Sequence, residues 1–335
     1  MKAMLQRSES GRARKAGRPI RAGARPGLSM AIAAIMAATL AACQAAPAGA
    51  IPTSPAPGSA DEARSPAAST VAETSPVPAA SAHPSVSPSG VAVAGSFDVG
   101  GHSLFLECLG SGSPTIVFLH GIGGDRSHGS PLRDAFSKRT RVCTYDRANM
   151  GSSDKVAGDL TGTEAATDLA NLLAAAHIEP PYLLVAGSFG GLVGLIYAGA
   201  HPTDVAGIVF IDASLPSDAD IDAMLAQRGL VPSSQPSDPY ANGGEVFRYS
   251  IHHEARAALA TLPRVPMSYL RALQFDAPPG APRDLMVSIG QKGIEAVLAR
   301  SSSPNEVDVN GPHYPFLQPP INVEVTRILD LLGTP

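Results

Sequence analysis

The sequence predicts a doubly wound, mostly parallel α/β sheet with a small helical cap, and three observations support this fold class. From about residue 96, short apolar segments alternate with helical patterns, as crossover connections between parallel strands require. The segment 114–119, PTIVFL, is almost continuously apolar, which is typical of a strand buried on both faces. The stretch 213–263 breaks the alternation with two helical patterns, 219–229 and 245–262, and is therefore expected to form the cap.

Local patterns predict the remaining elements. Residues 161–164, TGTE, have the form of a capping box, which opens an amphipathic helix over 163–177. Further helices are expected over 189–200 and 320–332. Strands are expected at six more segments: 103–109, 142–145, 182–186, 205–212, 266–273 and 306–309.

The composition excludes several classes of protein. Only 16% of the 335 residues are charged and the net charge is −4, so no basic field for nucleic acid is present in the sequence. Three cysteines are too few for a disulfide framework, and they form no C-x-x-C pair of the kind that binds zinc. No other motif points to a metal or an organic cofactor, and we expect neither. Beyond residue 45, no apolar run is long enough to span a bilayer.

The first residues have the pattern of a bacterial export signal. Residues 1–27 carry eight basic side chains against one acid, and the apolar segment 28–42 follows. This segment ends in Leu-Ala-Ala before Cys43, which resembles the lipobox of bacterial lipoproteins. The resemblance implies that 1–42 is removed and that Cys43 carries a lipid, anchoring the protein to the bacterial cell envelope. The alternative is an ordinary signal peptide, which would leave the protein secreted.

Residues 43–95 are expected to form a flexible tether. They are mostly Ala, Pro, Ser, Thr, Gly and Val, without helical or strand periodicity. Such a segment cannot bury enough apolar surface to offset the entropy lost on ordering. The folded domain is accordingly expected over 96–335, held away from the membrane by the tether.

Ser188 is the candidate nucleophile. It stands between an apolar strand and a helix in YLLVAGSFGGLVG, with Gly187, Gly190 and Gly191 around it. This is the setting of a nucleophile elbow, a sharp strand-to-helix turn that exposes the serine Oγ. Ala186 replaces the first glycine of the G-x-S-x-G pattern, but alanine is also small. The alternative is a glycine-rich turn without chemistry.

Other segments resemble the α/β-hydrolase superfamily, in family order, over about residues 100–333. HGIGG at 120–124 is similar to the loop that supplies one oxyanion-hole donor, which implies the backbone N–H groups of Ile122 and Phe189 as donors. His120 itself is expected to be structural. Two departures from the family pattern are Gly187, where histidine is frequent, and Pro312, where glycine is frequent. The other similar segments are RVCTYDRANMGSSD (141–154), AGIVFIDASLP (206–216) and VNGPHYPFLQPP (309–320).

The resemblance implies His313 as the general base and leaves two candidates for the acid. Asp212 ends the strand after the elbow helix, and Asp276 follows the next apolar strand. The second position is the commoner one in the family, whereas the branch that this chain resembles often keeps an aspartate at the first. We favour Asp212 and keep Asp276 as the alternative. The family's strand order would also make Cys108 and Cys143 neighbours, either in a disulfide or as two buried thiols.

The pattern as a whole favours hydrolysis of a small-molecule carboxylic ester (EC 3.1.1) through an acyl-enzyme on Ser188. A dehalogenase or a typical epoxide hydrolase would need aspartate at the elbow. Haloperoxidase-like and peptidase-like activities use the same triad and stay open. A surface binding protein on a hydrolase scaffold is the alternative from another class. The sequence identifies no protein partner.

Overall fold

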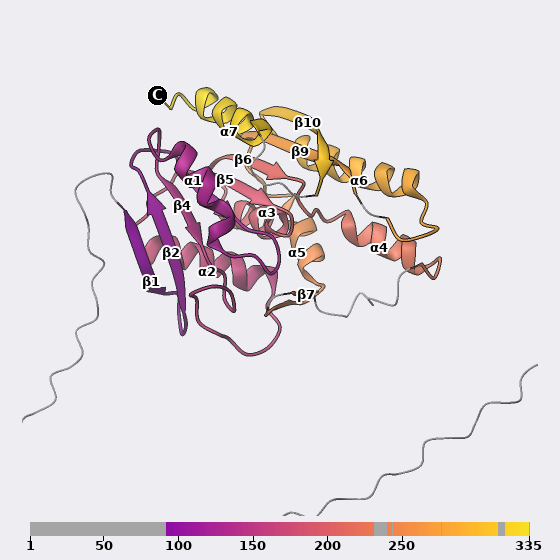
Figure 1. The fold of residues 1–335 in the computed structure, drawn as a ribbon, viewed down its shortest axis with the longest axis horizontal. Coiled ribbons are helices and arrows are strands. Elements are labelled where there is room, and N and C mark those ends of the chain that lie inside the picture. The colour runs from indigo at the N-terminus through magenta and orange to yellow at the C-terminus, as the bar shows by residue number, and fades with distance from the viewer. Residues whose placement is uncertain (1–91, 231–239, 243, 276, 314–318, 335) are drawn as a thin grey trace, which may run out of the picture. The chain divides into compact units, whose positions relative to one another are not determined.

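The computed structural model describes residues 92–334 except 231–239, 243, 276 and 314–318. Eight strands form one sheet in the order β1-β2-β4-β3-β5-β6-β9-β10 (Figure 1). Their bounds are Val93–Asp98 (β1), Ser103–Leu109 (β2), Thr115–Leu119 (β3), Val142–Tyr145 (β4), Tyr182–Gly187 (β5), Val205–Ile211 (β6), Pro266–Gln274 (β9) and Ser303–Pro312 (β10).

The sheet is mostly parallel, which confirms the predicted fold class. Only β2 runs antiparallel to its neighbours β1 and β4, and every other pair is parallel. The strand order reverses direction between β3 and β5, since the chain proceeds from β3 to β4 on one side and from β5 to β6 on the other. In open α/β sheets, ligands bind at such a switch point, beyond the carboxyl ends of the strands.

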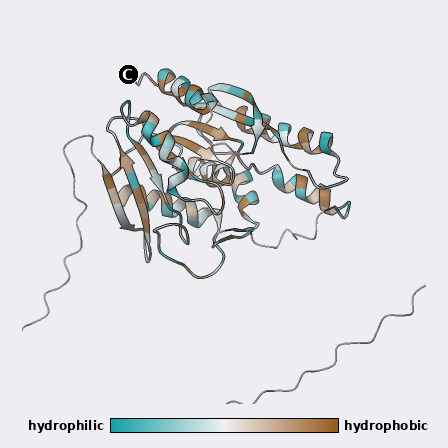
Figure 2. Ribbon diagram, viewed as in Figure 1, coloured by the Kyte–Doolittle hydropathy of each residue, from teal (hydrophilic) through white to brown (hydrophobic). Residues whose placement is uncertain are grey.

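Helices cover both faces of the sheet because the central strands are apolar on both sides. In β3, Ile116 and Phe118 belong to one buried cluster, and Val117 and Leu119 belong to the other. Figure 2 shows the central strands as largely hydrophobic and the helices as striped. The first cluster lies under α1 (Ser130–Phe136) and α7 (Pro319–Leu331); the second includes residues of α2 (Gly162–Ala175), α3 (Gly190–Ala200) and α6 (Arg283–Leu298).

The insertion between β6 and β9 differs from the expected pair of helices. It contains α4 (Asp218–Ala226), a hairpin of β7 (Tyr240–Asn242) and β8 (Glu245–Phe247), and α5 (Ile251–Ala258). The expectation of one helix from 245 to 262 is therefore wrong at its start. The signal was present, because Asn-Gly-Gly before Glu245 is typical of a hairpin turn. Helix α5 packs into the main core rather than above the site, with Ile251 and Ala255 fully buried.

Two helices, α6 and α1, and the edge strand β1 were also not anticipated. Helix α6 has a weak sequence signal because Gly290 and Gly293 lower its helix propensity. Gly293 is needed for packing, since a Cβ at this position would lie 2.0 Å from Oγ of Ser217. Helix α1 was also missed. Strand β1 begins at Val93, so the folded domain starts before the expected bound at residue 96.

The expected signal peptide, Cys43 and nearly all of the expected tether lie outside the described residues. Within the part of the chain that is described, no helix combines the length and apolar character needed to cross a membrane.

Cys108 and Cys143 form a disulfide between β2 and β4, with sulfur atoms 2.07 Å apart. They are direct partners in the antiparallel ladder, and both are fully buried. Of the two alternatives that the sequence left open, the structure contains the bonded one.

Removing this crosslink is expected to destabilise the domain. The bond joins residues 35 positions apart, and a loop of that size restricts the unfolded chain by about 3–4 kcal/mol in the chain-entropy model. Reductant should therefore lower the midpoint of guanidinium unfolding of the wild type. The Cys108→Ala/Cys143→Ala variant should start from the lower midpoint and show no response to reductant. A wild-type midpoint that is insensitive to full reduction would contradict the prediction.

Candidate active site

Ser188 lies in a strained turn between β5 and α3. Its φ is +49°, in the left-handed region that non-glycine residues seldom occupy. Helix α3 begins so close to the end of β3 that a Cβ at Gly190 would lie 2.2 Å from the Leu119 carbonyl oxygen. Glycine is therefore required there. The expected elbow geometry is present, with Ala186 fully buried in β5 in place of the motif's first glycine.

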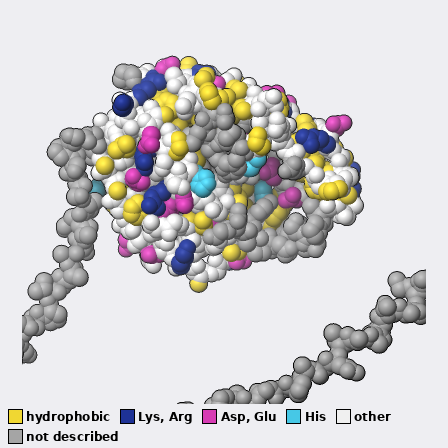
Figure 3. Space-filling view, in the orientation of Figure 1, with side chains coloured by type: hydrophobic (Ala, Val, Ile, Leu, Met, Phe, Trp, Pro, Cys, Tyr) yellow, Lys and Arg dark blue, Asp and Glu magenta, His cyan; other side chains and the backbone are white. Residues whose placement is uncertain are grey.

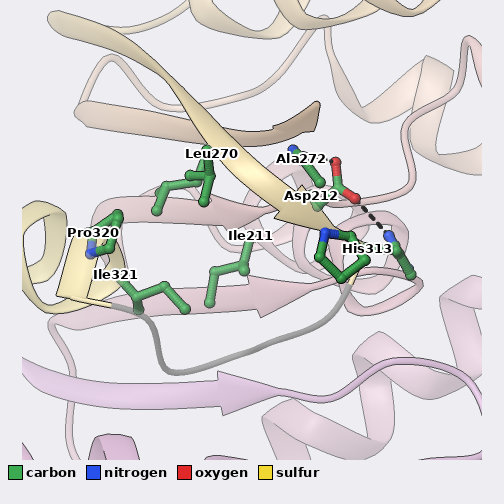
Figure 4. Close-up of a pocket in the computed structure, with 9 residues that line it drawn as sticks. Ile211, Asp212, Leu270, Ala272, His313, Pro320 and Ile321 are labelled. Carbon is green, nitrogen blue, oxygen red and sulfur yellow. Dashed lines mark hydrogen bonds and ion pairs between the residues drawn. The ribbon is translucent and has the colours of Figure 1, made fainter. Parts of the chain in front are cut away.

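Ser188, His313 and Asp212 form one chain of hydrogen bonds. The hydroxyl of Ser188 lies 2.9 Å from Nε2 of His313, and Nδ1 of His313 lies 2.5 Å from Oδ2 of Asp212. Beside the carboxylate, Nδ1 carries the proton and donates it, which leaves Nε2 to accept from the serine. Figure 4 shows Asp212 and His313 facing each other beyond the ends of β6 and β10. The tertiary fold thus joins residues that are 101 and 125 positions apart.

Asp212 is held in place by the neighbouring strand β9. Its backbone N–H donates to the Leu270 carbonyl at 2.7 Å, and its Oδ1 accepts the N–H of Ala272 at 3.0 Å. Its φ of +40° is a second left-handed value at the site, which the sequence did not signal. One carboxylate oxygen is therefore anchored, while the other faces His313. The alternative acid, Asp276, lies outside the described residues.

The 120–124 loop lies at the switch point, next to the elbow. His120 is fully buried; its Nδ1 donates to the Gly121 carbonyl at 2.8 Å, and its Nε2 faces the N–H of Arg147 at 3.4 Å. Burial, and then the positive charge of Arg147, hold the pKa of His120 well below its ordinary value. The ring is therefore neutral and fixes the loop, in agreement with its expected structural role.

The two proposed oxyanion donors belong to adjacent strand ends. Ile122 lies in the loop after β3, and Phe189 lies at the start of α3, directly after the elbow. Strands β3 and β5 are paired up to Leu119 and Ala186. Ile122 and Phe189 each follow three residues later, so both lie at the same edge of the sheet.

A buried ion pair next to this loop was missed at the level of sequence. Arg147 and Glu245 are bonded through two contacts, at 2.7 and 2.9 Å, with exposed fractions of 2% and 0%. Burial disfavours the charged form of Arg147, but the carboxylate of Glu245 outweighs this effect, and the pKa of Arg147 is raised. Arg147 stood in the recognised segment 141–154. Nothing in the sequence connected it with Glu245, which lies on strand β8 of the insertion between β6 and β9.

A cavity of about 390 Å³ opens beside Asp212 and His313, between α4, β9 and α6. This volume is in the usual range of sites for small molecules. Asp218 and Arg271 contribute ionisable groups to the wall. The apolar part of its lining includes Leu215, Ile221, Phe275, Met286, Val287 and Ile294.

The site is accessible from solvent. The side chain of His313 is 48% exposed. Figure 3 shows the mixture of side chains on one face of the molecule. On that face, acidic, basic and hydrophobic side chains are interspersed. Among the described residues, no group of three or more His, Cys, Asp and Glu side chains could hold a metal ion.

Comparison with known proteins identifies the family. Residues 114–291, more than half of the chain, match a family model described as "alpha/beta hydrolase fold". The chain belongs to the α/β-hydrolase family. The match includes the elbow, the 120–124 loop, Asp212 and α4, and it ends before His313.

Curated relatives of this α/β-hydrolase match over part of their length. The uncharacterized protein YqjL of Bacillus subtilis is 34% identical over 106 residues, which are 32% of this chain and 42% of that protein. The putative carbamate hydrolase RutD of Yersinia enterocolitica is 35% identical over 114 residues, or 33% of this chain and 41% of that protein. The chain thus spans less than half the length of these two relatives.

Solved structures share the fold of this α/β-hydrolase at low sequence identity. VinJ is 18% identical, with a TM-score of 0.52, and the alignment covers 72% of this chain and 99% of VinJ. Alpha/beta hydrolase domain-containing protein 10 from mouse is 19% identical, with the same TM-score, over 72% of this chain and 98% of that one. Both likenesses establish the fold alone.

Asp218 gives the domain a testable dependence on pH. Burial beside the cavity raises the pKa of Asp218 to about 7, and the N–H of Leu215 opposes this rise only in part. Since the unfolded carboxyl has a pKa near 3.9, the folded state binds more protons than the unfolded state between about pH 4 and pH 7. Stability contributed by this group is therefore lost as pH rises through that window.

The variant Asp218→Asn, which keeps an acceptor for the Leu215 N–H, should remove this loss. We measure the unfolding free energy of the variant and of the wild type by chemical denaturation. The variant minus wild-type difference should be about 1–2 kcal/mol larger at pH 8 than at pH 5. Asp134→Asn, at a side chain on α1 that is 65% exposed, is the control and should show no such difference. Equal gains for Asp218→Asn at both pH values would contradict the prediction.

Proposed function

We propose that this α/β-hydrolase is a serine hydrolase of carboxylic esters that acts through an acyl-enzyme on Ser188. The observation that carries the proposal is the unbroken hydrogen-bond chain from Ser188 through His313 to Asp212, at 2.9 and 2.5 Å. This is the arrangement that activates a serine for attack on a carbonyl group.

In the proposed reaction, Oγ of Ser188 attacks the ester carbonyl while Nε2 of His313 takes its proton. His313 then gives this proton to the leaving alcohol, and the acyl group stays on Ser188 until water repeats the sequence. Asp212 keeps Nδ1 of His313 protonated and stabilises the imidazolium that forms. Because Oδ1 of Asp212 is anchored to Ala272, the other oxygen is held toward the ring.

The negative charge that develops on the carbonyl oxygen would be stabilised by the backbone N–H groups of Ile122 and Phe189. Phe189 adds the start of α3, where the helix dipole favours negative charge. One such donor typically contributes about 10²–10³ in rate. The apolar cavity next to His313 would take an aliphatic or aromatic part of the ester.

Labelling with a fluorophosphonate probe tests the proposal directly. The native protein should be labelled on Ser188, as identified by peptide mass spectrometry, and heat-denatured protein should not react. A panel of p-nitrophenyl esters of graded chain length should then show turnover, with the preferred length set by the cavity. Failure of the native protein to react under conditions that label known serine hydrolases would favour a binding protein on a hydrolase scaffold.

Carbamate hydrolysis is the second candidate, because RutD of Yersinia enterocolitica carries the name putative carbamate hydrolase and matches this chain at 35% identity over 114 residues. A carbamate carbonyl would be attacked by the same serine. Adding p-nitrophenyl N-alkyl carbamates to the panel separates the two: esters should be hydrolysed with a higher kcat/KM if the first proposal holds. Haloperoxidase-like and peptidase-like activities can be assayed with the same preparation.

We further propose that the protein is exported and anchored by a lipid on Cys43. The support is the export signal and lipobox-like sequence, together with the disulfide, which suits an oxidising compartment. The mature N-terminal peptide from bacterial membranes should begin at Cys43 and carry the mass of a diacylglyceryl group. An unmodified N-terminus in the culture medium would instead support secretion.

A further inference from the structure

Cap strand β8 reaches the 120–124 loop through a buried ion pair. Glu245 of β8 and Arg147, which follows β4, are both inaccessible to solvent, with exposed fractions of 0% and 2%. Nε and Nη2 of Arg147 donate to the two carboxylate oxygens of Glu245 at 2.7 and 2.9 Å. Two parallel charge-assisted bonds fix the relative orientation of both side chains.

The same two side chains also bind the loop backbone. Nη1 of Arg147 donates to the His120 carbonyl at 2.6 Å, and Nη2 donates to the Gly121 carbonyl at 2.8 Å. After Ile122 in the sequence, the N–H of Gly123 donates to Oε2 of Glu245 at 2.8 Å. The ion pair therefore holds peptide groups on both sides of Ile122.

The contact with Gly121 determines the direction of the proposed oxyanion donor. The carbonyl of Gly121 and the N–H of Ile122 belong to one peptide group. Because a trans peptide is planar, its C=O and N–H point in opposite directions. Arg147 Nη2 and His120 Nδ1 both donate to this carbonyl, at 2.8 Å each, and the bond from Arg147 holds it toward the ion pair. The N–H of Ile122 is therefore directed away from the pair.

Strand β8 also supports the residue that would supply the second donor. The ring of Phe247 packs on the ring of Phe189 with centroids 4.8 Å apart, and Cζ of Arg147 lies 5.7 Å from the Phe189 ring centroid. Glu245 and Phe247, which are two residues apart in the cap, thus reach both sides of the proposed oxyanion hole.

We propose that Arg147 and Glu245 are positioning residues that orient the Ile122 N–H for stabilisation of the oxyanion. The inference rests on the proposed function. It means that the cap segment sets the reactivity of Ser188 as well as the shape of the substrate pocket. The retention of charge fits this role, because a buried ion pair by itself stabilises a fold no better than apolar side chains of similar size.

The double variant Arg147→Met/Glu245→Met separates positioning from stability. Removal of both charges leaves neither of them buried and unpaired, so the fold should be retained. The unfolding temperature should fall, because buried peptide groups of the 120–124 loop lose their partners, and kinetics are therefore measured well below it. It loses every contact from the pair to the His120, Gly121 and Gly123 peptide groups. We expect kcat for a p-nitrophenyl ester to fall by about 10²-fold while KM changes by less than about threefold, as for loss of an oxyanion donor.

Inhibition by an alkylboronic acid supplies a readout that a purely structural role would not change. The boronate bonded to Ser188 carries a negative oxygen in the oxyanion position, so its affinity should fall in parallel with kcat/KM. Active-site titration with a fluorophosphonate gives kcat per competent site. The control is Asp220→Asn, which breaks the half-exposed ion pair with Arg256 at 2.9 Å and should leave kcat and boronate affinity unchanged.

The inference would be overturned if the folded double variant had the same kcat and boronate affinity as the wild type. It would also be overturned if the variant had fewer competent sites but an unchanged kcat per site. If the double variant does not fold, Arg147→Lys decides the matter. Lysine keeps the positive charge beside Glu245 but not the planar fork that binds Glu245 and both loop carbonyls, so a folded protein with full kcat and boronate affinity would overturn the inference equally. If the wild-type protein neither hydrolyses esters nor binds boronate, the proposed function itself is wrong. If the wild-type protein is active and the variant is equally active, only this inference is wrong.

Discussion

Replacement of Ser188 by alanine is expected to lower kcat for ester hydrolysis by about 10⁴- to 10⁶-fold, with little change in KM. The physical reason is that Oγ of Ser188 is the only atom of this residue that can form the acyl bond, and His313 Nε2 lies 2.9 Å from it. Alanine keeps the backbone of the elbow and removes the nucleophile. The remaining rate would come from the oxyanion donors and from binding of the ester.

Steady-state kinetics with the best p-nitrophenyl ester of the panel measures this effect. The variant should also lose labelling by the fluorophosphonate probe. Ser250→Ala, at the start of α5 and bonded to Glu254 at 2.8 Å, is a matched control that should retain wild-type kcat. If Ser188→Ala kept more than a tenth of the wild-type kcat, another group would have to be the nucleophile.

Replacement of Asp212 by asparagine should lower kcat by about 10⁴-fold. The asparagine oxygen can still accept the N–H of Ala272, now 3.0 Å from Oδ1, so the fold should be retained. Its amide group would then face His313 as a donor and favour the tautomer with the proton on Nε2. A ring in that tautomer cannot accept the proton of Ser188.

Asp276→Asn is the paired experiment, since Asp276 was the other acid that the sequence allowed. We expect it to retain near-wild-type kcat, because Oδ2 of Asp212 already lies 2.5 Å from Nδ1 of His313. Circular dichroism of both variants would verify that neither result comes from unfolding. The opposite pattern, a 10⁴-fold loss in Asp276→Asn and activity in Asp212→Asn, would assign the acid to the later position.

Much of the fold was predictable because its signals are local. Continuous apolar runs marked β3, β4, β5 and β6, and the capping box marked the start of α2, where Thr161 accepts the N–H of Glu164 as expected. Helix α6 escaped prediction because its local signal is weak, whereas the β7–β8 hairpin had a local turn signal that was not recognised. Glycine lowers the intrinsic preference of α6 for helix, and only its contact with α4 explains why Gly293 is required there.

The sequence by itself determined the fold class and the candidate serine and histidine. The glycine-rich turn at Ser188, the His-Gly loop at 120 and the order of serine before histidine depend on neighbours along the chain, and they predicted the family and the candidate nucleophile. Only the tertiary structure decided which residues meet. It placed Asp212 against His313 across 101 positions, and Arg147 against Glu245 across 98. Such pairings arise because strands that are far apart in the sequence end at one edge of the sheet, and the insertion after β6 returns to the same edge. No local sequence pattern indicates which distant residues will meet there.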